Sequence, residues 1–280
     1  MTKEDEKIAC VKSAIEPLFH LTYSDENAIT ETQFRSSVHY FTLACALLSS
    51  STSSAHELLT WIPAYVSRVA SSSFLEFSKI YYLSTYRDNS RNRLKELVNL
   101  DQALLTESNI LLVEMMHLVL PLLKDKIKES SIDKNDDGDE VSAASARVPV
   151  GHAIIASYQF RWLVLQIHRP LIGKLCALVV PCGLTALDHW SPEVKGQGMM
   201  AFIHLGKNIV ANDLGSFGDP ILDACCNNIV SDNNIWRHAV EMSVVLATLV
   251  QHNDPRCPWY NIILCFGFKY TMLLKLVSGG

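Results

Sequence analysis

Apolar residues recur at helical spacing along nearly the whole chain, and no strand-like alternation of comparable length competes with them. One such stripe runs through Met199, Phe202, Ile203, Ile209 and Val210. A stripe of this period lets a helix bury one face. We therefore predict an all-α fold of about twelve helices, at residues 5–20, 31–50, 54–70, 73–86, 90–105, 108–129, 150–168, 170–187, 192–211, 217–230, 234–252 and 258–277.

One helix start is marked with unusual clarity. Ser191 is a residue type that favours the N-cap, Pro192 fits the first helical position, and Glu193 places an acid in the first turn. Serine can bond free amide groups, proline lacks the amide that would be unpaired there, and the acid faces the positive end of the helix dipole. We predict that a helix begins at Pro192.

The longest polar segment lies at residues 131–149 and is acidic and rich in Ser and Ala. Such a composition cannot bury a core of its own. We predict helical repeats at residues 1–130, an acidic flexible loop or linker at 131–149, and further repeats at 150–280, all within one continuous array.

The same segment contains a partial calcium-loop pattern. Asp133, Asn135, Asp137 and Gly138 follow the spacing of an EF-hand loop. The twelfth position, which needs a bidentate Glu, is Ala144. Because the closing ligand is missing, we expect a solvated acidic segment and no metal site.

The C-terminal half contains a weak internal repeat. Residues 178–209 align with residues 220–251 at a shift of 42, and the alignment pairs Val194 with Trp236, Lys195 with Arg237 and Met200 with Met242. A period near 42 matches the roughly 40–47 residues of HEAT and armadillo repeats. These repeats are helical hairpins that bury their apolar faces only when neighbours stack on them. We predict an α-solenoid of armadillo/HEAT-like helical hairpins.

Smaller details also resemble a HEAT unit. A proline occurs inside several predicted first helices, at Pro63, Pro121 and Pro181. Proline bends a helix because it removes a backbone hydrogen bond. Asp188 lies near the turn between two predicted helices, where its carboxylate can cap the next helix.

Composition argues against two classes of partner. The net charge is −5 at pH 7, whereas nucleic-acid-binding domains usually present a basic face. The apolar runs are shorter than a membrane span, which needs about 20 residues, or are broken by charges such as Glu114. The first ten residues, MTKEDEKIAC, resemble neither a secretory signal nor a transit peptide. We expect a cytoplasmic or nuclear chain with no nucleic acid and no membrane as partner.

The eight cysteines form no CxxC pair and no disulfide framework, so we interpret most of them as small buried hydrophobes; they are Cys10, Cys45, Cys176, Cys182, Cys225, Cys226, Cys257 and Cys265. His117, His204 and His238 lie in apolar helical runs without a partner at metal-ligand spacing. We expect hydrogen-bonded core or groove histidines and no metal.

No arrangement of residues carries catalysis. Asp188, His189 and Trp190 are neighbours in a turn and do not face one another. The glycine-rich KGQG stretch from Lys195 to Gly198 lacks the order of a phosphate-binding loop, so its small residues are better explained by close approach of two helices. We expect a protein that is not an enzyme and has no cofactor.

Two adjoining stretches carry a family resemblance: PCGLTALDHWSPEVKGQGMMAFIHLGKNI and GDPILDACCNNIVSDNNIWRHAVEMSVVLATLVQ. Residues 158–252 resemble armadillo/HEAT-type proteins related to the second Tel-two-interacting protein, in the plant form. The most specific part is the LDHW turn leading into VKGQG, where Asp188, Lys195 and Gly198 match the family pattern of a central repeat. The family tends to continue with further repeats, so we expect a shortened form whose final repeat lacks a cap and which self-associates in isolation.

The resemblance implies a scaffold subunit of the TTT co-chaperone complex, without catalysis or cofactor. This complex works with the ninety-kilodalton heat-shock chaperone to mature phosphatidylinositol-3-kinase-like kinases. The implied partners are a Tel-two-type solenoid and other TTT subunits, with the kinases bound indirectly. The interaction or repeat-turn positions that we expect are Asp188, His189, Trp190, Pro192, Lys195, Gly198, Trp236 and Arg237.

A second reading of the helical pattern is an importin- or adaptor-like solenoid that binds an extended peptide in its groove. Such a groove needs a ladder of Trp and Asn residues at the repeat period. The sequence offers Trp236 and Asn208 but no regular series.

Overall fold

The computed structural model describes residues 31–50, 59, 62–86, 107–130, 149–229 and 235–251, and this part of the chain is helical with no strand. The all-α prediction is confirmed for these residues. The elements are α2 (Glu31–Ser49), α3 (Ala64–Tyr86), α5 (Glu107–Glu129), α6 (Val150–Leu165), α7 (Leu171–Lys174), α8 (Cys176–Leu187), α9 (Pro192–Asn208), α10 (Ala211–Leu214), η5 (Gly215–Phe217), α11 (Gly218–Ile229) and α12 (Trp236–Gln251).

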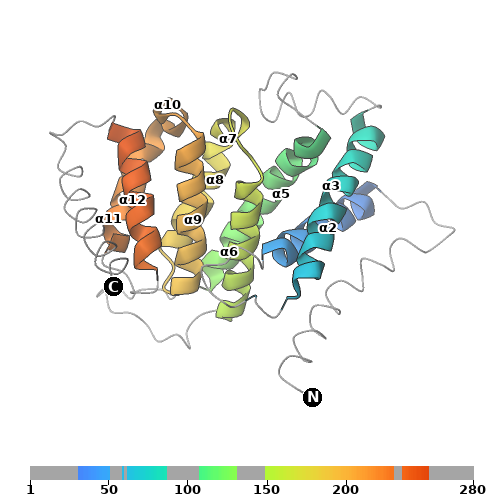
Figure 1. Cartoon of the computed structure of the whole chain (residues 1–280), viewed down its shortest axis with the longest axis horizontal. Helices are drawn as coiled ribbons and strands as arrows, with labels where there is room; N and C mark the ends of the chain where they lie inside the picture. The colour runs from blue at the N-terminus through green and yellow to red at the C-terminus, as the bar shows by residue number, and fades with distance from the viewer. Residues whose placement is uncertain are drawn as a thin grey trace, which may run out of the picture.

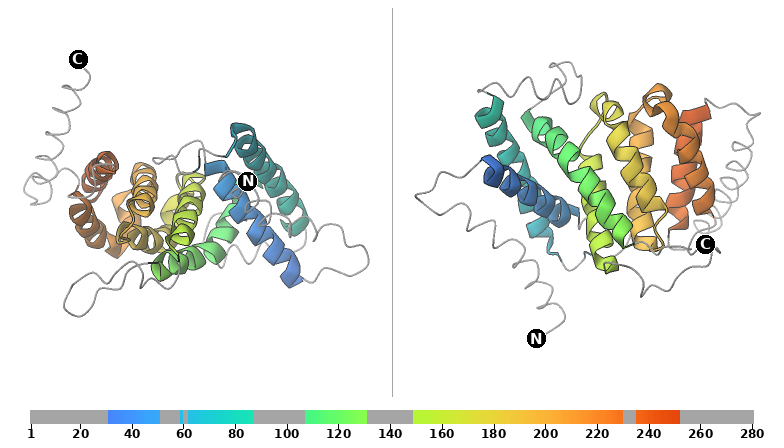
Figure 2. Two further views of the ribbon diagram at one scale, coloured as in Figure 1. Left: turned by 90° about the horizontal axis from the view of Figure 1, so that it is seen from below. Right: turned by 180° about the vertical axis from the view of Figure 1, so that it is seen from behind.

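The longer helices pack in two layers (Figure 1). Helices α6, α9 and α12 lie side by side in one layer, and α5, α8 and α11 lie behind them in the other (Figure 2). Three antiparallel hairpins, α5–α6, α8–α9 and α11–α12, therefore follow one another along the molecule. The α2–α3 pair adjoins the first of them, with α2 against α6 and α3 against α5.

Helix α6 is the centre of the core. Its residues 156–164 are all buried, because α2, α5 and α9 surround it. Its sequence is apolar on every side instead of along one stripe, as expected for a helix that is surrounded on all sides after its first turns. The two polar exceptions with long side chains are Gln159 and Arg161.

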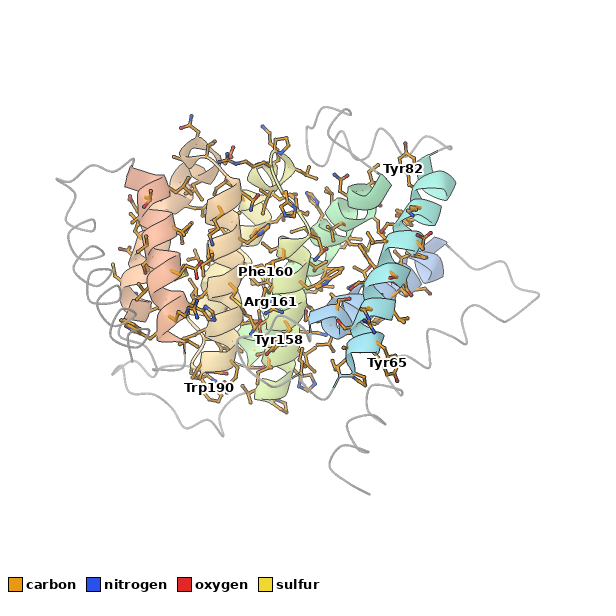
Figure 3. All side chains as sticks on the ribbon, viewed as in Figure 1. Tyr65, Tyr82, Tyr158, Phe160, Arg161 and Trp190 are labelled. Carbon is orange, nitrogen blue, oxygen red and sulfur yellow. The ribbon has the colours of Figure 1, made fainter. Side chains whose placement is uncertain are left out.

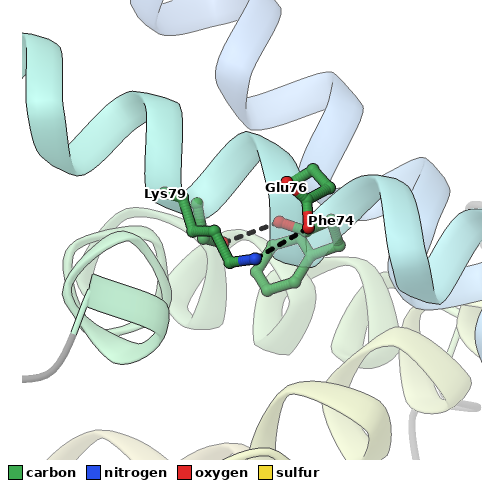
Figure 4. Close-up of polar contacts among 4 residues, drawn as sticks. Phe74, Glu76 and Lys79 are labelled. Atoms are coloured by element: carbon green, nitrogen blue, oxygen red, sulfur yellow. Dashed lines mark hydrogen bonds and ion pairs between the residues drawn. The ribbon is translucent and has the colours of Figure 1, made fainter.

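Helix α3 corrects two predictions. The expected helices at 54–70 and 73–86 are one helix, Ala64–Tyr86, and Pro63 stands just before it instead of inside a helix. The helix runs without interruption through the three serines at 71–73, and Ser71 Oγ donates to the carbonyl of Ser67 at 3.0 Å within it. A second serine of the same helix, Ser78, bonds back to the carbonyl of Phe74 at 2.7 Å (Figure 4).

The other helix boundaries lie closer to those predicted from the sequence. The helix expected at 170–187 is divided at Leu175 into α7 and α8, and the helix expected at 192–211 ends at Asn208 because Ile209 is extended. The predicted start at Ser191–Pro192 is confirmed. Prolines do lie inside α5 and α8, at Pro121 and Pro181. The described part holds fewer than the twelve expected helices, partly because 5–20, 90–105 and 258–277 lie outside it.

The described cysteines are free thiols. Cys45, Cys176, Cys182 and Cys225 are buried and Cys226 is half-buried. Burial raises the pKa of Cys45 to about 12, so this thiol stays protonated. The interpretation of cysteines as small buried hydrophobes is confirmed for the first four of these; Cys10, Cys257 and Cys265 lie outside the described residues. Over the described ranges, none of the helices has the length and apolar character needed to cross a membrane.

Candidate interaction edge at the starts of two helices

The turn between α8 and α9 brings together the residues that the sequence singled out. Asp188 is exposed and forms the C-terminal boundary of α8, while Ser191 is the N-cap residue of α9. The expectation that Asp188 caps the next helix is therefore wrong. The hydroxyl of Ser191 does not cap either, because it donates to Glu193 Oε2 at 2.5 Å.

His189 is a buried structural residue of this turn. Its Nδ1 accepts a hydrogen bond from the backbone N–H of Ser191 at 3.0 Å. Burial lowers the pKa of His189 to about 4, and the backbone of Ser130 opposes this shift. The ring is therefore neutral at neutral pH, and its full burial removes it from the set of candidate contact residues.

Trp190 is both anchored and accessible. Its indole N–H donates to the carbonyl of Ser130 at 3.1 Å, its ring stacks on His189 with centroids 5.6 Å apart, and the residue is 39% exposed. Figure 3 places it at the lower end of α9. Ser130 Oγ in turn donates to the carbonyl of Pro149 at 3.4 Å. The α8–α9 turn is thus tied to both residues that flank the acidic segment, whose residues 131–148 lie outside the described part.

The KGQG stretch is a helix-packing element. A Cβ at Gly198 would lie 3.0 Å from Ala186 Cβ, and one at Gly183 would lie 2.7 Å from the ring of Phe202. The close approach of α8 and α9 therefore depends on small residues, as the sequence suggested. Lys195 is half-buried in the first turn of α9.

The second pair of predicted residues opens α12. Trp236 is half-buried and Arg237 is exposed. Helices α9 and α12 pack together and begin at the same end of the molecule (Figure 1). We call the exposed residues Asp188, Trp190 and Arg237 the helix-start edge; Pro192, Lys195 and Trp236 are half-buried beside it, whereas His189 and Gly198 are buried.

Two of the three histidines lie as expected. His117 Nδ1 is 2.9 Å from the carbonyl of Val113, and His204 Nε2 is 2.8 Å from the carbonyl of Ile167. His238 is half-buried. Among the residues that the structure describes, no group of three or more His, Cys, Asp or Glu side chains could hold a metal ion.

Sequence reasoning missed the buried polar residues of the core. Gln159 and Arg161 on α6 and Gln197 on α9 are all buried. The available signal was their place within apolar runs, since an ionisable side chain inside a helix that is apolar on all sides has no solvent face to occupy.

Comparisons with known proteins give one informative match. The chain is 51% identical over 228 residues to an uncharacterized protein of Arabidopsis thaliana, a match that covers 81% of this chain and 50% of the relative. The chain thus spans about half the length of that relative. No family model matches the chain. No solved structure matches it either.

Proposed function

We propose that this chain is a non-enzymatic α-solenoid scaffold of armadillo/HEAT type. The observation that carries the proposal is the regular spacing of helix starts from α6 to α12; α5, which begins at residue 107 and precedes the 131–149 segment, does not share it. Helices α6, α9 and α12 begin at residues 150, 192 and 236, and α8 and α11 begin at 176 and 218. A spacing of 42 to 44 residues is that of a stacked helical hairpin.

The contacts between hairpins support the same reading. Gly206 of α9 approaches the next hairpin so closely that a Cβ there would lie 2.6 Å from Val245 Cγ1. Each hairpin of a solenoid buries its apolar face only against its neighbours, and the array offers an extended outer surface for partners. Binding through such a surface needs a few well-placed anchors and no pocket.

The partner that we propose is a Tel-two-type solenoid within the TTT co-chaperone complex, which supports maturation of phosphatidylinositol-3-kinase-like kinases. This choice rests on the resemblance of the LDHW turn and the VKGQG stretch to that family. The exposure of Asp188, Trp190 and Arg237 at one end of α9 and α12 supports the helix-start edge as the contact region. An aromatic and an Arg side chain are the residue types enriched at interface centres.

The peptide-groove alternative has less support. Asn208 donates its side-chain amide to the carbonyl of His204 at 2.9 Å, within its own helix. An importin-like groove would need that amide to be available for a peptide backbone. Trp236 is half-buried as well.

Affinity purification of the chain from cells, followed by mass spectrometry, tests the proposal. We expect a Tel-two-type protein to be recovered with the unmodified chain. The double variant Asp188→Arg/Arg237→Glu exchanges two exposed charges of the helix-start edge without changing the net charge, and it should reduce recovery at least tenfold. Recovery without any Tel-two-type protein would refute the partner.

A charge exchange at the other end of the molecule is the matched control. Lys79 Nζ pairs with Glu76 Oε1 at 2.7 Å on the exposed face of α3 (Figure 4). The variant Glu76→Lys/Lys79→Glu keeps both the pair and the net charge, so recovery should not change. Equal losses in the two double variants would remove the helix-start edge from the proposal.

A further inference from the structure

The α2–α6 contact contains three hydrogen bonds from buried side chains to backbone carbonyls of the other helix or its end. Gln159 Nε2 donates to the carbonyl of Leu43 at 3.0 Å. The single hydroxyl proton of Ser50 is shared between the carbonyl of Ala46 at 2.7 Å, within α2, and that of Tyr158 at 3.3 Å, and Arg161 Nη2 donates to the carbonyl of Ser50 at 3.1 Å. We call Ser50, Gln159 and Arg161 the polar latch.

Arg161 is the central member of the latch. Only 1% of its surface is exposed, and its guanidinium lies 5.3 Å from the centre of the Tyr158 ring (Figure 3). Ser50 directly follows α2, where carbonyl groups lack helical partners and the helix dipole is negative. Arg161 Nη1 also approaches Met200 Sδ at 3.7 Å, so this side chain contacts elements from three helices.

The apolar contacts of the α2–α3 pair do not by themselves fix its position on α6. Phe74 packs edge-on against Trp162 with ring centroids 5.1 Å apart, and other apolar residues surround them. Apolar packing accepts alternative arrangements of similar volume. A hydrogen bond to a particular carbonyl does not allow such alternatives. If the α2–α3 pair shifted by one helical turn, the buried guanidinium and amide would face apolar side chains.

We propose that the polar latch selects a single docking position of the α2–α3 pair on α6 and adds little to overall stability. Buried charged groups often cost as much in desolvation as they return in attraction, so replacing them with apolar side chains of similar length need not destabilise a fold. The replacement removes the hydrogen bonds that favour one register of the α2–α3 pair on α6 over the next register. This inference is independent of the partner proposed above.

Hydrogen exchange measured by mass spectrometry on the full chain tests the latch, using the double variant Gln159→Met/Arg161→Met. We expect amides of α2 and α3 to exchange at least tenfold faster, amides of α8, α9 and α12 to be unchanged, and the melting temperature to stay the same or rise. Unchanged protection of α2 and α3 would refute the proposal. A uniform loss of protection with a lower melting temperature would also refute it, since the latch would then be a stabilising element.

Gln197→Met is the matched control. Gln197 lies on α9 and is fully buried, and in the described part of the chain neither atom of its amide has a hydrogen-bond partner. The variant places the same new side chain in the core without touching the latch, so protection of α2 and α3 should not change. If it loosens α2 and α3 as much as the double variant, added methionine volume is the cause and the proposal fails. If the double variant does not fold, Gln159→Met alone is judged by the same criteria.

Discussion

The α2–α3 pair and the α8–α12 region are held by different kinds of contact. The pair is joined to α6 by buried polar side chains that reach chosen backbone carbonyls. Between α8 and α9, and between α9 and α12, glycine allows close apolar contacts in the interior, and an exposed ion pair, Lys207 with Glu241 at 2.8 Å, also joins α9 to α12. Gly183 and Gly206 each stand where a Cβ would overlap a side chain of the neighbouring helix.

The difference shows two ways of specifying how helices stack. Where the repeat is regular, close packing restricts the register, because a Cβ at Gly183 or Gly206 would overlap the side chain that fills the space beside it. Where α2 packs on α6, the packing restricts the register less, and the hydrogen bonds of the polar latch select it. Polar contacts also occur around α9. His189 and Ser191 bond to each other within one turn, Trp190 bonds to the carbonyl of Ser130 after α5, and His204 Nε2 lies 2.8 Å from the carbonyl of Ile167 after α6.

The largest effect that we expect in the regular region comes from Gly183→Val. The new side chain would overlap the ring of Phe202, which is buried and would have to shift within a packed core. We expect a loss of about 3 kcal/mol in the free energy of unfolding, measured by urea denaturation. Gly151→Ala is the control, since nothing lies within 4 Å of a Cβ there; it should stabilise by about 0.5 kcal/mol. Equal and small effects at both sites would contradict a register fixed by shape.

The next largest effect is the loss of stability that we expect at acidic pH because of His189. Burial lowers the pKa of His189 to about 4, from an ordinary value of 6.5. The unfolded chain therefore binds this proton more readily, so the contribution of the neutral ring to stability is complete above pH 6.5 and is lost as the pH falls towards 4. Between pH 7 and pH 5 we expect a loss of about 2 kcal/mol from this residue.

His189→Asn checks the origin of that loss. Asparagine does not titrate, and its carbonyl oxygen can still accept the hydrogen bond from the Ser191 N–H. The free energy of unfolding should then depend less steeply on pH between 6.5 and 4. An unchanged slope would show that groups other than His189 cause the acid sensitivity.

The sequence was sufficient to predict the features that depend on residues close together in the chain. Helical periodicity predicted the all-helical structure, and Ser191, Pro192 and Glu193 predicted the start of α9. The break expected after residue 70 was wrong, because α3 continues through the three serines at 71–73. Whether it does so depends on the packing of α3, which a local pattern does not contain.

The candidate site was predictable only in part. The turn residues Asp188 and Trp190 are exposed, as contact residues must be, but His189 is buried under the same turn. Nothing in the order Asp-His-Trp distinguishes which side chain turns inward. That choice depends on the carbonyl of Ser130, about 60 positions earlier in the chain, which accepts the indole N–H.

The smallest expected effect concerns this long-range bond. Trp190→Phe removes the indole N–H but keeps an aromatic ring beside His189, and because Trp190 is 39% exposed, water can replace the lost donor. We expect a loss of about 0.5 kcal/mol in the free energy of unfolding, near the lower limit for a hydrogen bond. A loss above about 2 kcal/mol, in the range of a buried unsatisfied group, would mean that this polar contact at the edge contributes more to stability than we expect of the buried latch. The two regions would then differ only in where their polar contacts lie, and shape would not be what fixes the register of α8 and α9.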